Sequence, residues 1–491
     1  MMKIIELIKT LIIVVLSLSM LYLWISYIDL QFDQSQRDTH EATIDRNFWI
    51  FTDETRSLSD VVADEEYFLP SSVSLVLSGK GYTSAYNEEL TSTLYSSYSP
   101  LITEIFSSAY ICKKENLNVW EKALLSEDAI LIEYCAPLPY STIALFSGRK
   151  DNYCLGQMCF VKALLLFSDD SNNLTALSLD SDSNVFSYKW ENEDTHGMIY
   201  DFNSNNLAAY TVNKGFIDFD FNQNSSKTRT SKKLPSEYKM LTSVPKLDTI
   251  KVENPLTDLL NNVFASEDDT YLTLLKEEKI AELIDIFEIN PNVMGYYSDS
   301  ESGIFMVGHD ISLIVSPQGT VEYSATDAST LPITVSELLG TARTDFTSDE
   351  ILAAATAFIN EFPDGFITNG AKLILKGTRY SPEKDEMMFD FGYYYQLCEI
   401  VGQNLNCGVS LTFNSKGLVK AVITPISAEK TSDNNSSSIE HLGVSITPSV
   451  AIKLIDEEKV DDLAPVYFVS DYKTSVLPAW AAKTKAGRVN L

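Results

Sequence analysis

Histidine is scarce in this sequence, with only four residues, His40, His196, His309 and His441, scattered along 491 positions. The motifs Cys-x-x-Cys, His-Glu-x-x-His and Gly-x-Ser-x-Gly, which are typical of redox, zinc-protease and serine-hydrolase sites, are absent. These absences leave no recognisable catalytic constellation and no set of ligands for a cofactor or metal. We therefore predict that the protein is not an enzyme and binds no cofactor.

Basic residues are also few: Lys and Arg total 37 against 68 Asp and Glu, which gives a formal net charge of −31. A chain this acidic is repelled by phosphate backbones, so we predict no nucleic-acid partner. Hydrophobic residues make up 45% and charged residues 21%, both close to globular averages, which excludes a wholly disordered chain. The length corresponds to roughly two to four domains.

One long apolar run is present. Residues 10–28 carry no charge, and a helix of this length crosses the roughly 30 Å hydrocarbon core of a bilayer. Two lysines precede the run and acidic residues follow it, so the positive-inside rule places residues 1–9 in the cytoplasm and the rest outside. We predict a single-pass signal anchor in the cell membrane. The alternative is a cleaved signal peptide with its site at 17–19, although the apolar run continues well past that point.

Two small polar residues of this run, Ser19 and Ser26, are one heptad apart. Small residues allow another helix to approach closely in lipid. Ser19 and Ser26 are therefore candidate transmembrane contacts, and the alternative is chance spacing in a serine-containing span.

The six cysteines form an even set, which in an extracytoplasmic protein suggests disulfides. Cys398 and Cys407 flank a turn signal at 402–404 between two strand-like runs, so they could face each other across a hairpin. Cys154 and Cys159 enclose another tight turn, and the remaining pair by elimination is Cys112 with Cys135. Buried free thiols are the alternative, and a four-thiolate metal site needs closer spacing.

Composition divides the chain into successive segments. A polar, Ser-rich and basic stretch at 222–236 is the best linker candidate. The predicted segments are a cytoplasmic N-terminus (1–9), a transmembrane helix (10–28), a stalk (29–47), an N-terminal extracytoplasmic domain (48–235), a middle domain (236–330) and a C-terminal domain (331–491).

Local patterns predict both strands and helices in the extracytoplasmic part. Thr347 and Glu350 form a capping-box signature that opens a helix. Helices are predicted at 101–110 (after Pro100), 255–264, 271–287, 351–362 and 447–458. Strands are predicted at 73–77, 129–134, within 303–323, at 371–380, 387–400, 405–424, 464–470 and 476–484.

A short motif recurs three times, at 177–188, 313–323 and 411–421. Each copy reads as a strand, a tight turn with Gly or Asn where positive φ is needed, and a second strand. One hairpin in each predicted domain indicates about three related units. The predicted fold class is α+β, with extracytoplasmic antiparallel sheets and helices packed on one face.

Two motifs could be mistaken for sites. Asp180, Asp182 and Asn184 have the spacing of calcium-loop ligands, but Val185 stands where such a loop needs glycine. A β-turn is therefore the favoured interpretation. His309 with the adjacent Asp310 could suggest an acid–base pair. Neighbouring strand residues point to opposite faces, so a turn is again favoured.

The organisation resembles that of the YycH family and its smaller relative YycI, most clearly from about residue 270 onwards. The short N-terminus, single span and long extracytoplasmic part occur in the same order. The segments that carry the resemblance are 306–313 (MVGHDISL), 319–323 (GTVEY), 349–362 with Arg379 and Tyr380, 387–424, 446–452 (ITPSVAI) and 477–480 (LPAW). The sequence departs from the family pattern in having more cysteines and a basic tail at 483–491.

The resemblance implies a function rather than a reaction. Members of this family are membrane-anchored accessory regulators of the WalK (YycG) sensor histidine kinase of Gram-positive bacteria, which controls cell-wall metabolism. It therefore implies a WalK-like kinase partner, a YycI-like partner and contact with the bilayer through one span. The alternative is an extracytoplasmic ligand-binding or envelope-scaffold module without a kinase partner.

Overall fold

The structure is a computed structural model that describes parts of the chain from residue 65 onwards. The described residues are 65–77, 80–126, 128–139, 143, 160–168, 174–180, 184–190, 217–221, 239–241, 247–264, 278–291, 294–299, 303–326, 331–381, 383–402, 408–431, 462–470, 472, 475–484 and 487–490. No helix within these ranges has the length and apolar character needed to cross a membrane. The predicted span, stalk and helix at 447–458 lie outside the described residues and stay predictions.

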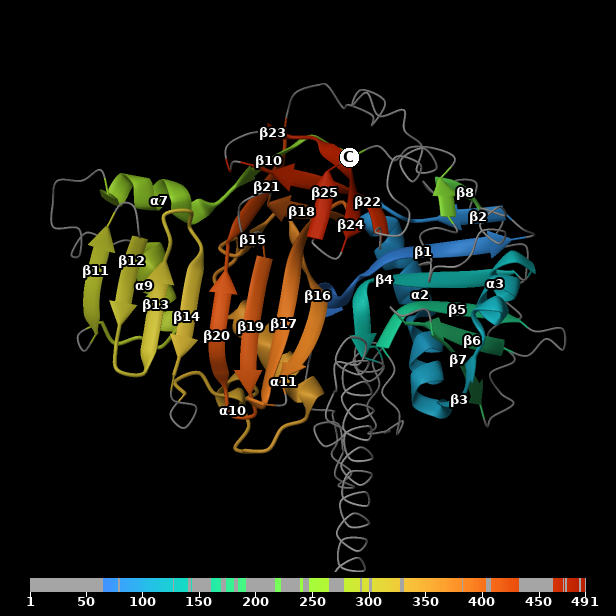
Figure 1. Cartoon of the computed structure of the whole chain (residues 1–491), viewed down its shortest axis with the longest axis horizontal. Coiled ribbons are helices and arrows are strands. Elements are labelled where there is room, and N and C mark those ends of the chain that lie inside the picture. Colours follow the sequence, from blue (N-terminus) through green and yellow to red (C-terminus); the bar gives the residue numbers. More distant parts are fainter. Residues whose placement is uncertain are drawn as a thin grey trace, which may run out of the picture.

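Nine antiparallel strands from the first half of the chain form one sheet (Figure 1). They are β1 (Pro70–Leu77), β2 (Lys80–Thr83), β3 (Ala109–Glu115), β4 (Ala129–Pro139), β5 (Phe160–Ser168), β6 (Leu174–Leu179), β7 (Val185–Trp190), β8 (Ile217–Phe221) and β9 (Lys239–Leu241). Their order in the sheet is β3-β7-β6-β5-β4-β1-β2-β8-β9. The strands predicted at 73–77 and 129–134 are confirmed by β1 and β4.

Helices α2 (Glu88–Ser108) and α3 (Leu117–Ser126) pack on opposite faces of this sheet. Val73 of β1 lies in the buried cluster that contains Ile102 of α2, whereas Val76 lies in the cluster around Trp120 of α3. Side chains an odd number of residues apart along a strand point to opposite faces, so both faces are buried. The prediction that helices cover one face only is therefore wrong for this sheet.

The first predicted helix has the wrong limits. Pro100 lies inside α2 rather than at its start, and Ala109 and Tyr110 already belong to β3. A proline inside a helix removes one backbone donor, which is tolerated where the freed carbonyl can bind water. Pro100 and Ser96, four residues earlier, are both exposed.

A second sheet of twelve strands dominates the rest of the chain. It contains β11 (Gly295–Asp299), β12 (Gly303–Val307), β13 (Ile311–Val315), β14 (Val321–Ala325), β16 (Lys372–Ser381), β17 (Glu386–Tyr395), β18 (Cys398–Gly402), β19 (Gly408–Asn414), β20 (Leu418–Ile423), β22 (Asp462–Val469), β24 (Pro478–Thr484) and β25 (Gly487–Asn490). The order is β11-β12-β13-β14-β20-β19-β17-β18-β22-β24-β25, and β16 pairs with β17. Its pairs are antiparallel except β18 with β22.

The three predicted hairpins are confirmed as β6–β7, β13–β14 and β19–β20. The last two lie side by side, because β14 pairs with β20 from Val321↔Ile423 to Ser324↔Lys420. The twelve-stranded sheet therefore continues across the domain boundary predicted at 330/331. The fold is a sheet-rich α+β fold with antiparallel sheets and few helices among the described residues.

Helices α9 (Glu278–Ile286), α10 (Val335–Leu338) and α11 (Ser348–Asn360) accompany the twelve-stranded sheet, whose strands lie in front of α9 and α11 in Figure 1. Phe287, directly after α9, stacks on Tyr323 of β14 with ring centroids 4.9 Å apart and meets Phe358 of α11 at 5.6 Å. This aromatic cluster attaches both helices to one face of the sheet.

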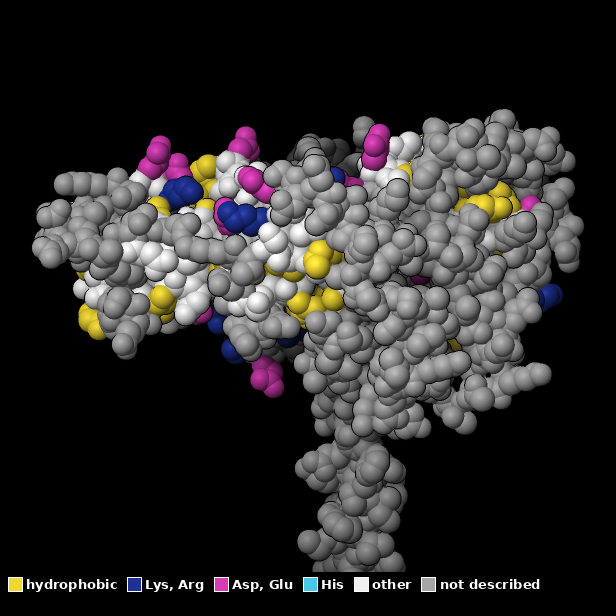
Figure 2. Space-filling view, turned by 90° about the horizontal axis from the view of Figure 1, so that it is seen from above, with side chains coloured by type: hydrophobic (Ala, Val, Ile, Leu, Met, Phe, Trp, Pro, Cys, Tyr) yellow, Lys and Arg dark blue, Asp and Glu magenta, His cyan; other side chains and the backbone are white. Residues whose placement is uncertain are grey.

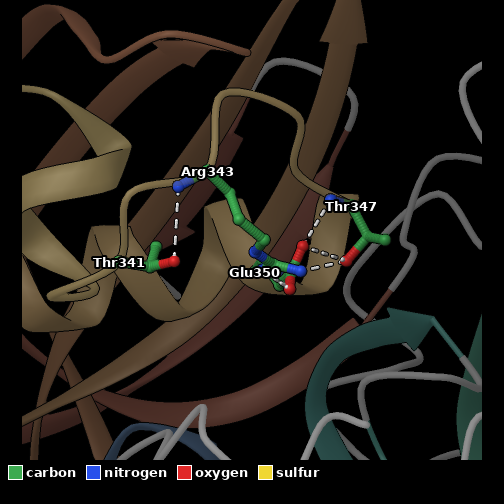
Figure 3. A network of polar contacts seen from close by, with 4 residues as sticks. All are labelled: Thr341, Arg343, Thr347 and Glu350. Carbon is green, nitrogen blue, oxygen red and sulfur yellow. Dashed lines mark hydrogen bonds and ion pairs between the residues drawn. The ribbon is translucent and has the colours of Figure 1, made fainter. Parts of the chain in front are cut away.

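The predicted capping box opens α11 and is extended by an arginine (Figure 3). The backbone N–H of Thr347 donates to Glu350 Oε2 at 2.8 Å, and the Glu350 N–H donates to Thr347 Oγ1 at 3.3 Å. Arg343, from the loop before the helix, forms an ion pair with the other Glu350 oxygen. The Glu350 side chain is only 4% exposed, so this network holds the loop onto the helix.

A small four-stranded sheet joins the middle of the chain to its C-terminal part. Its strands are β10 (Ile250–Glu253), β15 (Thr368–Asn369), β21 (Ile426–Lys430) and β23 (Ser475–Val476). Asn254 follows β10 and starts α7 (Pro255–Phe264), a helix predicted with these limits. Its Oδ1 accepts from the Leu256 N–H, and its Nδ2 donates to the Gly319 carbonyl, which fixes α7 to the β13–β14 turn.

The nine-stranded and twelve-stranded sheets lie side by side (Figure 1). They meet where β4 of the first sheet contacts β16 of the second. The 3-10 helix η2 (Glu65–Phe68) reaches across: Tyr67 Oη donates to Asn360 Oδ1 at 2.6 Å. Lys372 of β16 pairs with Glu88 of α2 at 2.9 Å. The outer side of β16 is therefore covered by the first part of the chain.

Glu288, just after α9, is expected to be a weak point of this fold. Its φ is +51°, where asparagine is tolerated better than glutamate. Partial burial and the nearby Glu337 carboxylate raise the pKa of Glu288, so its ionised form favours the unfolded chain. We expect Glu288→Asn to stabilise the protein by about 0.5–1 kcal/mol at neutral pH, mostly by relieving backbone strain, because solvent screens the repulsion between exposed carboxylates.

The measurement is thermal unfolding of Glu288→Asn against Glu361→Asn, because Glu361 has an ordinary φ of −69°. A protonated Glu288 no longer repels Glu337, so the gain should shrink as the pH falls through the raised pKa. An equal gain from both substitutions, or a gain that grows on acidification, would contradict this explanation.

Candidate interaction surface

The site residues predicted from the sequence lie mostly outside the described part of the chain. Those outside it are Ser19, Ser26, Cys154, Cys159 and Cys407. Cys112 is on β3, but its side chain is also outside the described residues. Cys135 is half-buried on β4 and Cys398 is buried on β18. The predicted disulfides and transmembrane contacts therefore stay predictions.

The strands next to Cys398 and Cys407 differ from the predicted hairpin. β18 and β19 both pair antiparallel with β17, so they run in the same direction along one side of it. The hairpin turn lies earlier, at Gln396 and Leu397, where φ is +50° and +59°. Two consecutive residues with positive φ match the twist of a two-residue hairpin, although the usual Asn-Gly signal is missing.

His309 and Asp310 lie in the turn between β12 and β13, as predicted. In this turn their side chains meet, with Nδ1 and Oδ1 2.6 Å apart. The rule of opposite faces holds within a strand, and β12 ends two residues earlier at Val307. The His309 side chain is 95% exposed, which makes this a surface pair.

The calcium-like motif is used within its own turn. The Asp180 carboxylate accepts hydrogen bonds from the Asn184 backbone and side-chain amides, both at 2.7 Å. These bonds close the β6–β7 turn, as the favoured interpretation predicts. In the ranges that the structure describes, no group of three or more His, Cys, Asp or Glu residues could hold a metal ion.

A continuous row of side chains crosses the face of the twelve-stranded sheet that α9 and α11 leave open. Strand register places these residues next to one another: Tyr297, Phe305, Ile314, Glu322, Val422, Ser410 and Asp390. All seven are exposed or half-buried. We call this set the open-face row.

The row one residue away on the same strands has the opposite character. It consists of Tyr296, Met306, Leu313, Tyr323, Ala421, Leu411 and Phe389, and all but the half-buried Tyr296 are buried. Burial raises the pKa of the Tyr323 hydroxyl well above its usual value, and the Glu288 carboxylate adds to the shift. One face of the sheet is therefore core and the other remains accessible in the described part of the chain.

The open-face row is polar at the end that lies near β16. Asp390 accepts hydrogen bonds from Arg379 Nη2 at 2.8 Å and from Ser410 Oγ at 2.7 Å. Arg379 is largely exposed, so this ion pair contributes little to stability. Figure 2 looks onto the upper end of the molecule rather than onto this face, and it shows acidic and basic side chains close together there.

The other end of the row is apolar. Tyr297 of β11 is 58% exposed, and its ring lies 5.8 Å from that of Phe305 on β12. Val307, also on β12, is 51% exposed. Large exposed hydrophobic side chains that gather in one place indicate a contact surface. We call Tyr297, Phe305 and Val307 the apolar corner.

Sequence reasoning missed the open-face row and its apolar corner. It treated the strands between 303 and 323 only as parts of a hairpin, and it assigned no strand at 295–299. The missed signal is the pair of tyrosines at 296 and 297 beside Gly295, a β-forming run just before β12. Which face of those strands is open depends on where the helices pack, and a strand pattern alone does not show this.

No family model and no curated protein matches this sequence. Among solved structures, the chain is similar to YycH from Bacillus subtilis, with a TM-score of 0.45 and 11% sequence identity over 87% of this chain and 97% of that one. It also matches an uncharacterized protein from Eubacterium rectale, with a TM-score of 0.23 and 12% identity over 48% of this chain and 76% of that one. Both TM-scores are below 0.5, and these similarities do not assign the chain to a family.

Proposed function

We propose that this protein is a membrane-anchored, non-enzymatic regulator of a two-component sensor histidine kinase that controls cell-wall metabolism. The span at residues 10–28 places the protein in the membrane with the kinase, and the extracytoplasmic part binds the kinase or a YycI-like partner. The sequence resemblance supports this proposal. Its segments at 306–323, 349–362 and 387–424 fall on β12–β14, α11 and β17–β20, which build or support the open face.

The open-face row is the observation that carries the proposal. A regulator without a catalytic site acts only through binding, and it shifts a kinase only when it binds one conformation more tightly than the other. Such binding needs an accessible surface with apolar anchors and a polar rim. The open-face row has this composition, from Tyr297 at one end to Asp390 at the other.

Co-purification from membranes tests the proposal. We expect the full-length protein to bring a sensor kinase with it, and we expect Val307→Asp with Glu322→Lys to reduce the kinase recovered about tenfold, since loss of one apolar anchor costs roughly 1–2 kcal/mol. Both side chains are exposed, so the fold should be unaffected. Val119→Asp is the matched control, because Val119 is also exposed but belongs to α3, which packs on the nine-stranded sheet.

A parallel variant, Ser19→Leu with Ser26→Leu, tests the transmembrane contact. It keeps the run hydrophobic and adds bulk where another helix would approach. Loss of the kinase in this variant alone would place the contact in the span, and loss in the open-face variant would place it on the sheet. Recovery of the wild-type protein without any kinase would contradict the proposal and favour an envelope scaffold.

A further inference from the structure

Sheet edges are normally protected against pairing with another chain, and the described edges of this protein illustrate the usual means. Short length, basic residues, bulges and covering segments all oppose strand addition. β15 and β23 have two residues each, β9 has three and begins with Lys239, β25 has four and carries Arg488, and β3 carries Lys113 and Lys114 beside a register shift. β16 is covered by η2 and β4.

β11 is the exception among the described edges. It ends the strand order of the twelve-stranded sheet and pairs with β12 over all five residues, from Gly295↔Val307 to Asp299↔Gly303, without a bulge. It contains no Lys, Arg or Pro, and its one charged residue, Asp299, is at its end. Its centre is two tyrosines, which favour strands.

The apolar corner lies at this same edge. Among the described residues, four large hydrophobic side chains are exposed, and the two most exposed are Tyr297 and Val307. The composition of β11 is one observation, and the exposure of Tyr297 on β11 and Val307 on β12 is another. Both indicate a strand-pairing surface.

We propose that β11 pairs antiparallel with β11 of a second copy of this chain. The register that uses all five residues has its centre at Tyr297, which places Tyr297 opposite its own copy and Tyr296 opposite Ser298. Asp299 then lies opposite Gly295, so no two carboxylates face each other in the paired strands. A chain with a net charge of −31 can therefore pair with itself at this edge without like charges in register. The two twelve-stranded sheets become one continuous sheet.

The expected association is weak. Pairing of two five-residue strands buries less than the roughly 1,200–2,000 Å² of a typical stable interface. The dimer therefore forms at high protein concentration and dissociates on dilution. This inference does not depend on a kinase partner, and its test is independent of the co-purification experiment.

Cysteine cross-linking of the full-length protein in detergent tests the register. Facing residues in antiparallel strands have Cβ atoms about 4.5–5.5 Å apart, which a disulfide can bridge after a small adjustment. Under mild oxidation, Tyr297→Cys should give a covalent dimer, and peptide mass spectrometry should show that its disulfide joins the introduced thiols of the two copies. The wild-type protein controls for the six native cysteines, and Val119→Cys controls for an exposed cysteine elsewhere.

Sedimentation across a range of concentrations gives the second readout. Tyr297→Lys places two like charges opposite each other in the dimer and should weaken association at least tenfold, while its melting temperature stays at the wild-type value because residue 297 is exposed. Cross-linking of Tyr297→Cys no greater than that of Val119→Cys would overturn the proposal. So would a wild-type protein that is monomeric at every concentration, or a dimer that Tyr297→Lys leaves intact.

Discussion

Replacing Lys376 with methionine is expected to lower the free energy of unfolding by about 2–4 kcal/mol, a large effect for a residue on the sheet surface. Lys376 forms an ion pair with Glu399 of β18, whose side chain is only 4% exposed. Removal of one partner of a buried pair leaves the other charge in a medium that solvates it poorly. The Lys376 side chain is itself 42% exposed, which keeps the expected cost below that of a fully buried pair.

The path of the Lys376 side chain explains a glycine in the middle of β17. A Cβ atom at Gly392 would clash with Lys376 Cδ, so the lysine stem passes over the space that Gly392 leaves. The register of β16 with β17 shifts between Leu375 and Gly377, which sets Lys376 at an irregularity from which it crosses β17 to reach β18. Three strands therefore share one ion pair.

Urea denaturation of a small set of variants checks this prediction. Lys372→Met is the matched control: its ion pair with Glu88 is about one-third exposed on both sides, so its loss should cost less than about 1 kcal/mol. Lys376→Met combined with Glu399→Met should recover most of the lost stability, because no buried charge remains. Equal costs for the two lysines, or no recovery in the double variant, would show that the pair is not buried in the way described.

Local signals in the sequence predicted local structure well. The capping box of Thr347 and Glu350, the helix at 255–264 and the three hairpins each depend on residues a few positions apart. Turn and capping residues satisfy backbone groups directly, so their chemistry can be recognised without knowledge of the fold.

Features that depend on distant strands could not be predicted in this way. The pairing of β14 with β20 and the position of β18 between β17 and β22 follow from the packing of the whole sheet. The Lys376–Glu399 pair and the open-face row follow from the same pairings. A pattern of alternating residues shows that a strand has two faces, but the helices decide which one is buried. For this reason the sequence placed candidate contacts in the span and none on the open face.

Replacing Glu350 with alanine is expected to lower the free energy of unfolding by about 2–3 kcal/mol, although the capping box alone would suggest about 1 kcal/mol. The carboxylate accepts the Thr347 N–H at 2.8 Å and pairs with Arg343 (Figure 3). Arg343 also lies over the Phe346 ring, 5.5 Å from its centroid. Loss of Glu350 therefore releases the arginine and the loop that it holds, in addition to one helix cap.

The chain contains a matched control for this substitution. Thr334 and Glu337 form a second capping box at the start of α10, with the same reciprocal bonds, but Glu337 is exposed. Glu337→Ala should therefore cost no more than about 1 kcal/mol, the usual value for an exposed cap. Arg343→Leu should account for most of the difference between the two glutamates, and it should add little to Glu350→Ala, because both changes break the same contact. If the two glutamate substitutions cost the same, the arginine contributes nothing, and the buried position of Glu350 reflects packing alone.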